Sequence, residues 1–129
     1  MIARSLSDKR ILVKVQVNEK DGVMLLDTGA SLSMIDESKS GYYGFRKGVK
    51  FAGTIQGAGG EISAYHAKNL MVNLEGIAMY QFITADISSI VASIRRETGI
   101  TVCGIIGLPQ MKAAEIKIYP ANGIIKIGY

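Results

Sequence analysis

A short segment in the first quarter of the chain has residue types and spacing suited to acid–base chemistry. In residues 27–31 the order is Asp-Thr-Gly-Ala-Ser, directly after the apolar run at 23–26. A carboxylate is costly to bury unless it is paired or hydrogen-bonded, so an acid at the end of a buried strand needs a reason. One interpretation is a catalytic Asp27 presented on a tight turn. The other is an ordinary turn, because Asp, Thr and Gly are common turn residues. On these residues alone the ordinary turn is the better interpretation.

The other reactive residue types do not form a competing site. Cys103 is the only cysteine and His66 the only histidine, and they lie in different segments. A cysteine nucleophile needs an adjacent base, but His66 lies in an alternating, strand-like segment without a nearby acid. No group of His, Cys, Asp and Glu has the spacing of metal ligands. We therefore expect no metal and no cofactor.

A glycine-rich segment at 57–60, Gly-Ala-Gly-Gly, lies between two strand-like arms. Glycine adopts positive φ without steric penalty, so the pattern predicts a hairpin with a pliable tip. A phosphate-binding loop is the alternative. It is disfavoured because no Lys-Ser/Thr pair and no helix follow the glycines.

The elements that must position Asp27 are mainly short strands. Alternation at 11–17 and the apolar run at 23–26 predict a hairpin whose second strand is central and ends at Asp27. Further strands are expected at 70–74, 77–84, 100–103, 116–118 and 124–127. A helical stripe at 87–94 predicts the main helix, with Asp86 or Ser88 as N-cap, Gly99 as C′ residue and the stripe itself as core packing. A short helix is expected from Leu108, with Pro109 in its first turn. The fold class is therefore mostly β, closed or sandwich-like.

Length and charge exclude several classes of protein. A chain of 129 residues, 48% hydrophobic and 20% charged, fits a single globular domain over 1–129, with 1–10 flexible or peripheral. The net charge is +4, but the basic residues are scattered, so we expect no nucleic-acid partner. No apolar run is long enough to span a bilayer, and the first ten residues lack the apolar core of a secretory signal, so we expect no membrane partner; a signal or anchor that has been removed is the alternative. The single cysteine and the missing signal favour the cytoplasm.

Three features in a fixed order carry a resemblance to a known family. They are Asp-Thr-Gly-Ala-Ser at 27–31, the glycine-rich hairpin, and Gly-Ile-Ile-Gly at 104–107 before a short helix. In this order the chain resembles the retropepsin-like (retroviral-type) aspartic proteases from Ile11 onward. The resemblance implies a closed β barrel, one half of an acid protease, with one main helix and a short C-terminal helix. The flap tip, the long helix near Val91 and the connection at 36–50 depart from the family pattern.

The resemblance also implies roles for individual residues. Asp27 would activate water, Thr28 would hydrogen-bond across a dimer, and Gly29 would let the substrate backbone approach. The residues expected at the substrate are Ala30 and Ser31 on the floor, the lid residues Ile55, Gln56, Gly57, Ala58, Gly59 and Gly60, and the supporting pair Ile105 and Ile106 beneath the turn. The partner would be an extended peptide or protein, bound by strand-like main-chain hydrogen bonds.

The chemistry requires a second carboxylate. Two carboxylates that share one proton can deprotonate water and protonate the amide, because like charges in close contact resist ionising together. Only one Asp-Thr-Gly occurs, and Asp21, Asp36 and Asp86 are not in comparable turns. We therefore expect a two-fold homodimer acting as an aspartic endopeptidase. The alternative is a catalytically silent domain of the same fold that binds peptides or assembles with partners; a structural β domain with a chance turn is a third interpretation.

Overall fold

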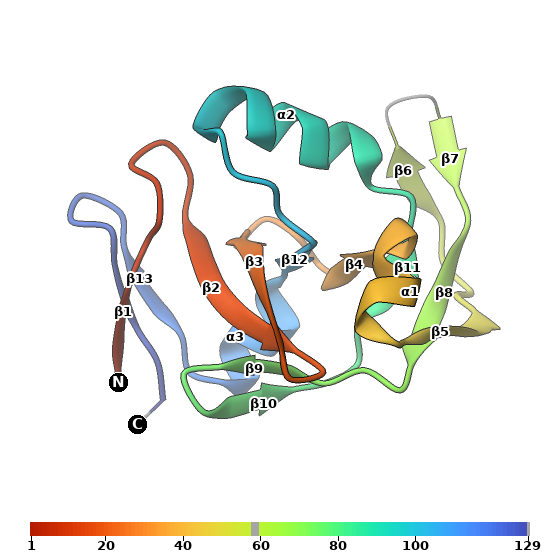
Figure 1. Cartoon of the computed structure of the whole chain (residues 1–129), viewed down its shortest axis with the longest axis horizontal. Helices are drawn as coiled ribbons and strands as arrows, with labels where there is room; N and C mark the ends of the chain where they lie inside the picture. Colours follow the sequence, from red (N-terminus) through yellow and green to blue (C-terminus); the bar gives the residue numbers. More distant parts are fainter. Residues whose placement is uncertain (58–59, 129) are drawn as a thin grey trace.

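The computed structural model describes residues 1–57 and 60–128, and it is built mainly from short strands. Nine strands form the main sheet, in the order β10-β9-β2-β3-β12-β4-β11-β8-β5. A three-stranded sheet, β1-β14-β13, and a two-stranded hairpin, β6-β7, complete the architecture. The mostly-β prediction is confirmed (Figure 1).

The strands of the main sheet are β2 (Leu12–Val17), β3 (Lys20–Leu26), β4 (Met34–Asp36), β5 (Arg46–Lys50), β8 (Ala64–Lys68), β9 (Val72–Leu74), β10 (Ile77–Met79), β11 (Ile83–Ala85) and β12 (Gly104–Ile106). The hairpin consists of β6 (Ile55–Gly57) and β7 (Gly60–Ile62), and the terminal sheet of β1 (Ile2–Arg4), β13 (Lys117–Tyr119) and β14 (Ile124–Lys126). The helical elements are η1 (Glu37–Lys39), α1 (Ser40–Tyr43), α2 (Ser88–Thr98) and α3 (Leu108–Ala113).

The predicted hairpin at the start of the chain is present as β2 and β3. Val13, Val15 and Val17 are buried while Lys14 and Gln16 are exposed, so one face of β2 packs on the core. β3 is buried over its last three residues, which end at Leu26. Asp27 therefore follows directly on a core strand.

The centre of the main sheet consists of three adjacent strands, β3, β12 and β4, and β12 is distant from the other two in the chain. β12 pairs in parallel with β3, Leu26 opposite Ile106, and antiparallel with β4. A Cβ at Gly104 would collide with the Met34 carbonyl, and one at Gly107 would lie 2.5 Å from the Leu32 carbonyl. Only glycine fits at either end of β12 because the backbones approach so closely.

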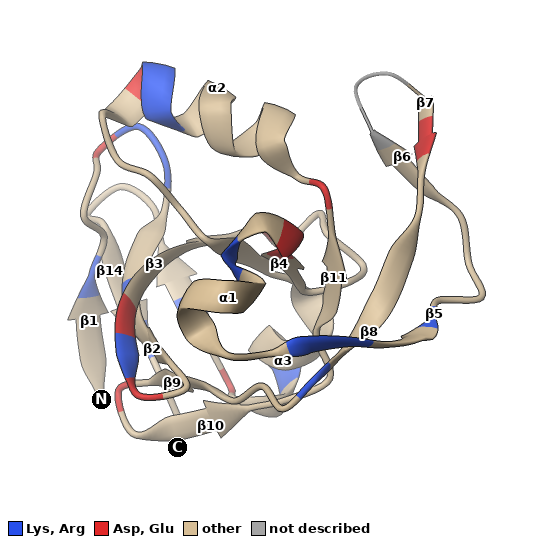
Figure 2. Ribbon diagram, turned by 45° about the vertical axis from the view of Figure 1, so that its right-hand side comes forward, with Lys and Arg blue, Asp and Glu red and all other residues tan. Residues whose placement is uncertain are grey.

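The main helix, α2, covers the ends of the central strands. It terminates at Gly99, whose φ of 76° is the left-handed conformation expected of the predicted C′ residue. The Asp86 carboxylate accepts a hydrogen bond from the Ser88 amide at 3.0 Å, although Ile87 is the N-cap residue. Figures 1 and 2 show α2 and the β6–β7 hairpin rising on the same side of the sheet.

Three predicted elements differ from the structure. The strand expected at 77–84 is wrong: it is two strands, β10 and β11, which lie far apart in the sheet order. Gln81, at a φ of 66°, breaks the extended conformation between them. The strand expected at 100–103 is also misplaced, because the paired residues are those of β12. Within 36–50 the structure has η1, α1 and β5, where only one short strand was anticipated.

The N-terminal segment is part of a sheet. β1 pairs antiparallel with β14, Ile2 opposite Lys126, and so lies at the edge of the terminal sheet beside the C-terminal hairpin. The Met1 amine also donates to the Ile127 carbonyl at 3.0 Å. Residues 2–4, expected to be flexible or peripheral, form this edge strand.

Candidate active site

Asp27 is held at the end of β3 by main-chain hydrogen bonds. Its amide donates to the Ile106 carbonyl at 3.0 Å, which continues the β3–β12 ladder by one residue. Its carboxylate Oδ1 accepts from the Gly29 amide at 2.9 Å, and its carbonyl accepts from the Ala30 amide at 3.1 Å. The half-buried carboxylate is therefore fixed in direction while keeping a face toward solvent.

The turn rests on the segment that follows β12. The Leu108 amide donates to the Ala30 carbonyl at 2.9 Å, so residues 27–30 are bonded on both sides. Ile105 and Ile106 are 3% and 0% exposed and belong to two different apolar clusters, one on each face of the sheet. Both side chains lie beneath the turn; Ile106 is enclosed in the core, whereas Ile105 also lines a pocket beside Asp27.

A buried polar network lies behind the turn. Ser33 accepts a hydrogen bond from the Gly107 amide at 2.7 Å and donates to the Gln110 side-chain oxygen. The Gln110 amide group donates to the carbonyls of Tyr80 and Gln81, at 2.8 and 3.2 Å. The network ties the segment after Asp27 to α3 and to the loop between β10 and β11. Sequence reasoning missed Ser33 and Gln110, because a single Ser and a single Gln carry no periodic signal.

Two pockets share Asp27 as a lining residue. One, of about 430 Å³, lies between Asp27 and α2 and is lined by Arg10, Leu25, Asp27, Ser89, Ile90, Ser93, Ile94 and Ile105. The other, of about 340 Å³, is lined by Asp8, Lys9, Arg10, Ile11, Leu25, Leu26, Asp27 and Pro120. α2 was expected to be core packing only, so its contribution to this surface was missed. The signal was available in Ser89 and Ser93, which lie one helical turn apart.

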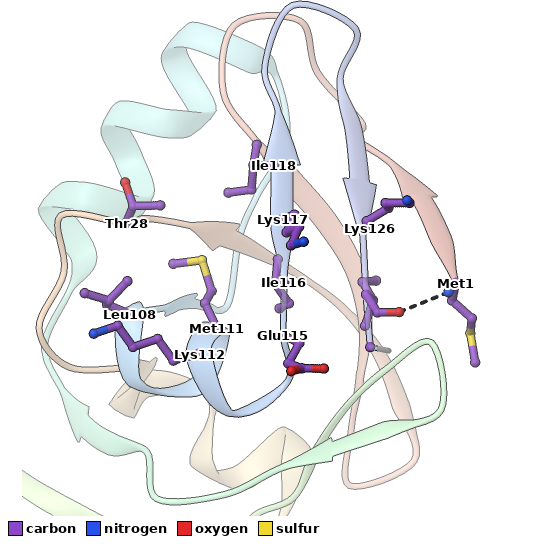
Figure 3. A pocket seen from close by; sticks show the side chains of 12 residues that line it. Met1, Thr28, Leu108, Met111, Lys112, Glu115, Ile116, Lys117, Ile118 and Lys126 are labelled. Carbon is purple, nitrogen blue, oxygen red and sulfur yellow. Dashed lines mark hydrogen bonds between the residues drawn. The ribbon is translucent and has the colours of Figure 1, made fainter.

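A third and larger groove, of about 570 Å³, lies on the other side of Thr28. Figure 3 shows Thr28 above Leu108, Met111 and Lys112 of α3, opposite Ile116, Lys117 and Ile118 of the chain leading into and along β13. The Thr28 side chain is exposed at the rim of this groove. Thr28 therefore adjoins an open groove in which apolar residues of α3 and β13 alternate with lysines and Glu115.

The predicted lid residues are in a hairpin, apart from the turn. Ile55 pairs with Ile62, Gln56 with Glu61 and Gly57 with Gly60. The Ile55 side chain is buried in a cluster that includes Ala64, Ile83 and Leu32. This cluster connects the base of the hairpin to the segment after Asp27, while none of the described hairpin residues lines the two Asp27 pockets. Ala58 and Gly59 lie outside the described residues.

The arrangement is suited to acid–base rather than metal chemistry. Within residues 1–57 and 60–128, no group of three His, Cys, Asp or Glu side chains could hold a metal ion.

In that same part of the chain, no helix has the length and apolar character needed to cross a bilayer. Figure 2 shows acidic and basic residues on many elements, with the basic residues of β5 (Arg46, Lys47 and Lys50) close together.

Comparisons with known proteins agree with the arrangement of strands around Asp27. The backbone is similar to the EIAV protease complexed with the inhibitor HBY-793, at 21% identity over 85% of this chain and 92% of that one, with a TM-score of 0.60. It is also similar to the retroviral protease-like domain of Ddi1 from Leishmania major, at 18% identity over 92% and 87%, with a TM-score of 0.59. These likenesses show a retropepsin-like fold. No curated protein matches the sequence. Residues 13–109 match the aspartyl protease family, and the chain belongs to that family.

Proposed function

We propose that the protein is an aspartic endopeptidase that hydrolyses extended polypeptides as a two-fold homodimer. The observation that carries the proposal is the Asp27 carboxylate, oriented by the Gly29 amide at the end of a core strand and open to solvent beside two pockets. An ordinary turn would account for the Asp27–Gly29 hydrogen bond, but not for the two pockets that open beside the carboxylate.

The chemistry needs two carboxylates and one proton. The ionised Asp27 accepts a proton from a water molecule as the water oxygen attacks the peptide carbonyl. The protonated Asp27 of the second copy donates its proton to the amide nitrogen, and the C–N bond breaks to give a carboxyl group and an amine. Like-charge repulsion between the two carboxylates keeps one of them protonated.

The groove beside Thr28 supports the dimer. Leu108 and Ile118 are apolar residues on opposite sides of this groove, which adjoins the turn at Asp27 and is also lined by Lys112 and Lys117 (Figure 3). A second copy placed there would bring its own residues 27–29 next to those of the first, with Thr28 of each copy at the contact. The single domain over 1–129 thereby supplies one half of a shared site.

The decisive experiment compares three Asp→Asn variants in cleavage of a peptide library. Asp27→Asn is expected to lower kcat by about 10²- to 10⁴-fold, the range of a lost general acid or base. Asp21→Asn, an exposed acid outside both Asp27 pockets, is the matched control and keeps wild-type cleavage. Equal cleavage by wild type and Asp27→Asn would refute the proposal.

Asp8→Asn tests where the second carboxylate comes from, because Asp8 lines a pocket with Asp27. A homodimer predicts that inactive Asp27→Asn chains lower the activity of wild-type chains when the two are mixed. Loss of activity in Asp8→Asn without this mixing effect would place both carboxylates in one chain. Peptide binding without cleavage by the wild type would favour the silent binding module.

A further inference from the structure

We propose that helix α2 forms the wall of the substrate pocket beside Asp27, and that Ile90 and Ser93 set the size of the apolar side chain it accepts. The inference rests on the proposed endopeptidase function. In it, α2 contributes a side of the substrate pocket in addition to the turn, the hairpin and β12. The side chain in question is the one next to the bond that is cut, because Asp27 itself lines the pocket.

The pocket has an apolar floor. Leu25, Ile94 and Ile105 are buried and contact one another in a single cluster, which also contains Leu12 and Val102. Ile90, which is 37% exposed, lines the pocket without being part of that cluster. At about 430 Å³ the pocket falls in the range of sites that enclose small organic groups. A charged side chain placed on this floor would lose its hydration, so Leu, Met and Phe are favoured over Asp and Lys.

One face of α2 is directed at this pocket. Ser89 and Ser93 are four residues apart, as are Ile90 and Ile94, so the two pairs lie along one side of the helix. The serines are short, which leaves room between the helix and Asp27. On the same helix, Val91 packs against the buried cluster and Ala92 is exposed and does not line the pocket.

Both ends of α2 are fastened to neighbouring segments. Near its start, the Ser88 amide bonds to the Asp86 carboxylate at 3.0 Å. Near its end, the Arg10 guanidinium Nε contacts both Glu97 carboxylate oxygens, at 3.2 and 3.1 Å, and the Lys9 ammonium donates to the Glu97 carbonyl at 3.3 Å. Arg10 lines both Asp27 pockets, so this ion pair closes the pocket at the end of the wall. The Arg10–Glu97 pair is solvent-exposed and orients α2 without making it rigid, so the selection by size rests on the side chains of Ile90 and Ser93.

The test uses two matched pairs of variants on α2. Ser93→Leu fills the pocket, while Ala92→Leu adds the same atoms one residue away, outside it. Ile90→Ala enlarges the pocket, while Val91→Ala removes a comparable side chain from the core side. For each variant, kcat/KM is measured for peptides that differ only in having Ala, Leu or Phe beside the cut bond. Thermal melting shows whether each variant is folded.

Ser93→Leu is expected to lower kcat/KM for the Phe and Leu peptides about tenfold relative to the Ala peptide, the scale of one or a few carbon atoms in an apolar pocket. Ile90→Ala is expected to shift the ratio toward Phe. Ala92→Leu and Val91→Ala keep the wild-type ratios. Wild-type ratios in both Ser93→Leu and Ile90→Ala would overturn the inference while leaving the endopeptidase intact.

If the wild type cleaves no peptide, the proposed function fails, and the pocket is then tested by binding. Dissociation constants of the same Ala, Leu and Phe peptides are measured for the chain carrying Asp27→Asn, alone and together with Ser93→Leu. A preference for Leu and Phe that Ser93→Leu removes supports the wall. Equal affinity for all three peptides, before and after the substitution, refutes it.

Discussion

Ala30 follows Asp27 in the turn that we propose to be catalytic, and its methyl side chain cannot donate a hydrogen bond to the carboxylate. Its amide donates to the Asp27 carbonyl and its carbonyl accepts from the Leu108 amide, while its methyl group packs partly buried against the cluster beneath α2. The Asp27 carboxylate accepts from a main-chain amide, that of Gly29. A hydroxyl at position 30 would add a side-chain donor where the native turn has none.

We therefore expect Ala30→Ser to shift the pH profile of cleavage. A donated hydrogen bond stabilises the charged carboxylate, so a lower pH is needed to protonate it and the acidic limb of kcat/KM moves to lower pH. Ala30→Thr offers the same donor and should move the limb in the same direction. An unchanged limb, or one at higher pH, would contradict the idea.

Gln110 is expected to be the most sensitive polar residue outside the turn. Gln110→Leu leaves the buried Ser33 hydroxyl without its partner, and an unsatisfied buried group costs about 1–3 kcal/mol; the carbonyls of Tyr80 and Gln81 belong to exposed residues that water can reach. The free energy of unfolding in urea should fall by about 1–3 kcal/mol. Gln16→Leu makes the same change at an exposed site on β2 and should stay within about 0.5 kcal/mol of wild type.

Cys103 is expected to be an unreactive thiol in the folded protein. It is 4% exposed, and burial raises the pKa of the thiol above its usual value, so little thiolate is present near neutral pH. Modification by a thiol reagent at pH 8 should be slow until urea unfolds the chain. Rapid, stoichiometric modification without urea would show that the loop before β12 opens.

At the scale of elements, sequence patterns predict a strand or helix correctly where one face of that element is buried. The alternating valines of β2 and the C′ glycine of α2 were predicted because each follows from local geometry. The break between β10 and β11 was not, because Gln81 adopts positive φ with carbonyl support from Gln110, a residue 29 positions away. Local pattern cannot reveal a turn that a distant side chain stabilises.

The start of α2 gives a prediction with a defined pH dependence. The side chain and the amide of Ser88 both donate to the Asp86 carboxylate, and these hydrogen bonds lower its pKa from the usual 3.8. The stabilisation is present above pH 3.8 and is lost as the pH falls through the lowered value. Asp86→Ala should therefore lower the melting temperature at pH 7, with the difference shrinking below pH 3.8. A difference that is constant from pH 7 to pH 2 would contradict this origin.

At the scale of the whole molecule, the proposed dimer is tested at Leu108. This residue is 36% exposed, on the groove beside Thr28. Leu108→Glu places a charge on an apolar contact, so the variant should be monomeric at concentrations where wild type is dimeric, with cleavage lost in parallel. Val49→Glu, at an exposed site on β5, is the control, and this variant should have the same sedimentation coefficient as the wild type. A wild-type protein that stays monomeric at high concentration would remove the dimer.

The global arrangement could be expected only through the resemblance. Residues 27–31 and 104–107 each mark a turn or an apolar strand, but nothing in either segment states that β12 lies between β3 and β4. That placement depends on two glycines that allow backbone contact, at 104 and 107. The α2 wall was missed because the apolar stripe was taken as core packing throughout. Val91 and Ile94 do pack in the core cluster, whereas Ile90 is exposed and lines the pocket with the two serines.

The pairing of β3 with β12 also sets a time at which the turn can form. The Asp27 amide bonds to a carbonyl 79 residues later, and the Ala30 carbonyl to an amide of Leu108. Contacts between such distant residues form slowly, after the intervening chain has been ordered. During synthesis, an emerging chain carries Asp27 long before it carries the strand that orients it. The turn at Asp27 therefore lacks these two hydrogen bonds until residue 108 has left the ribosome.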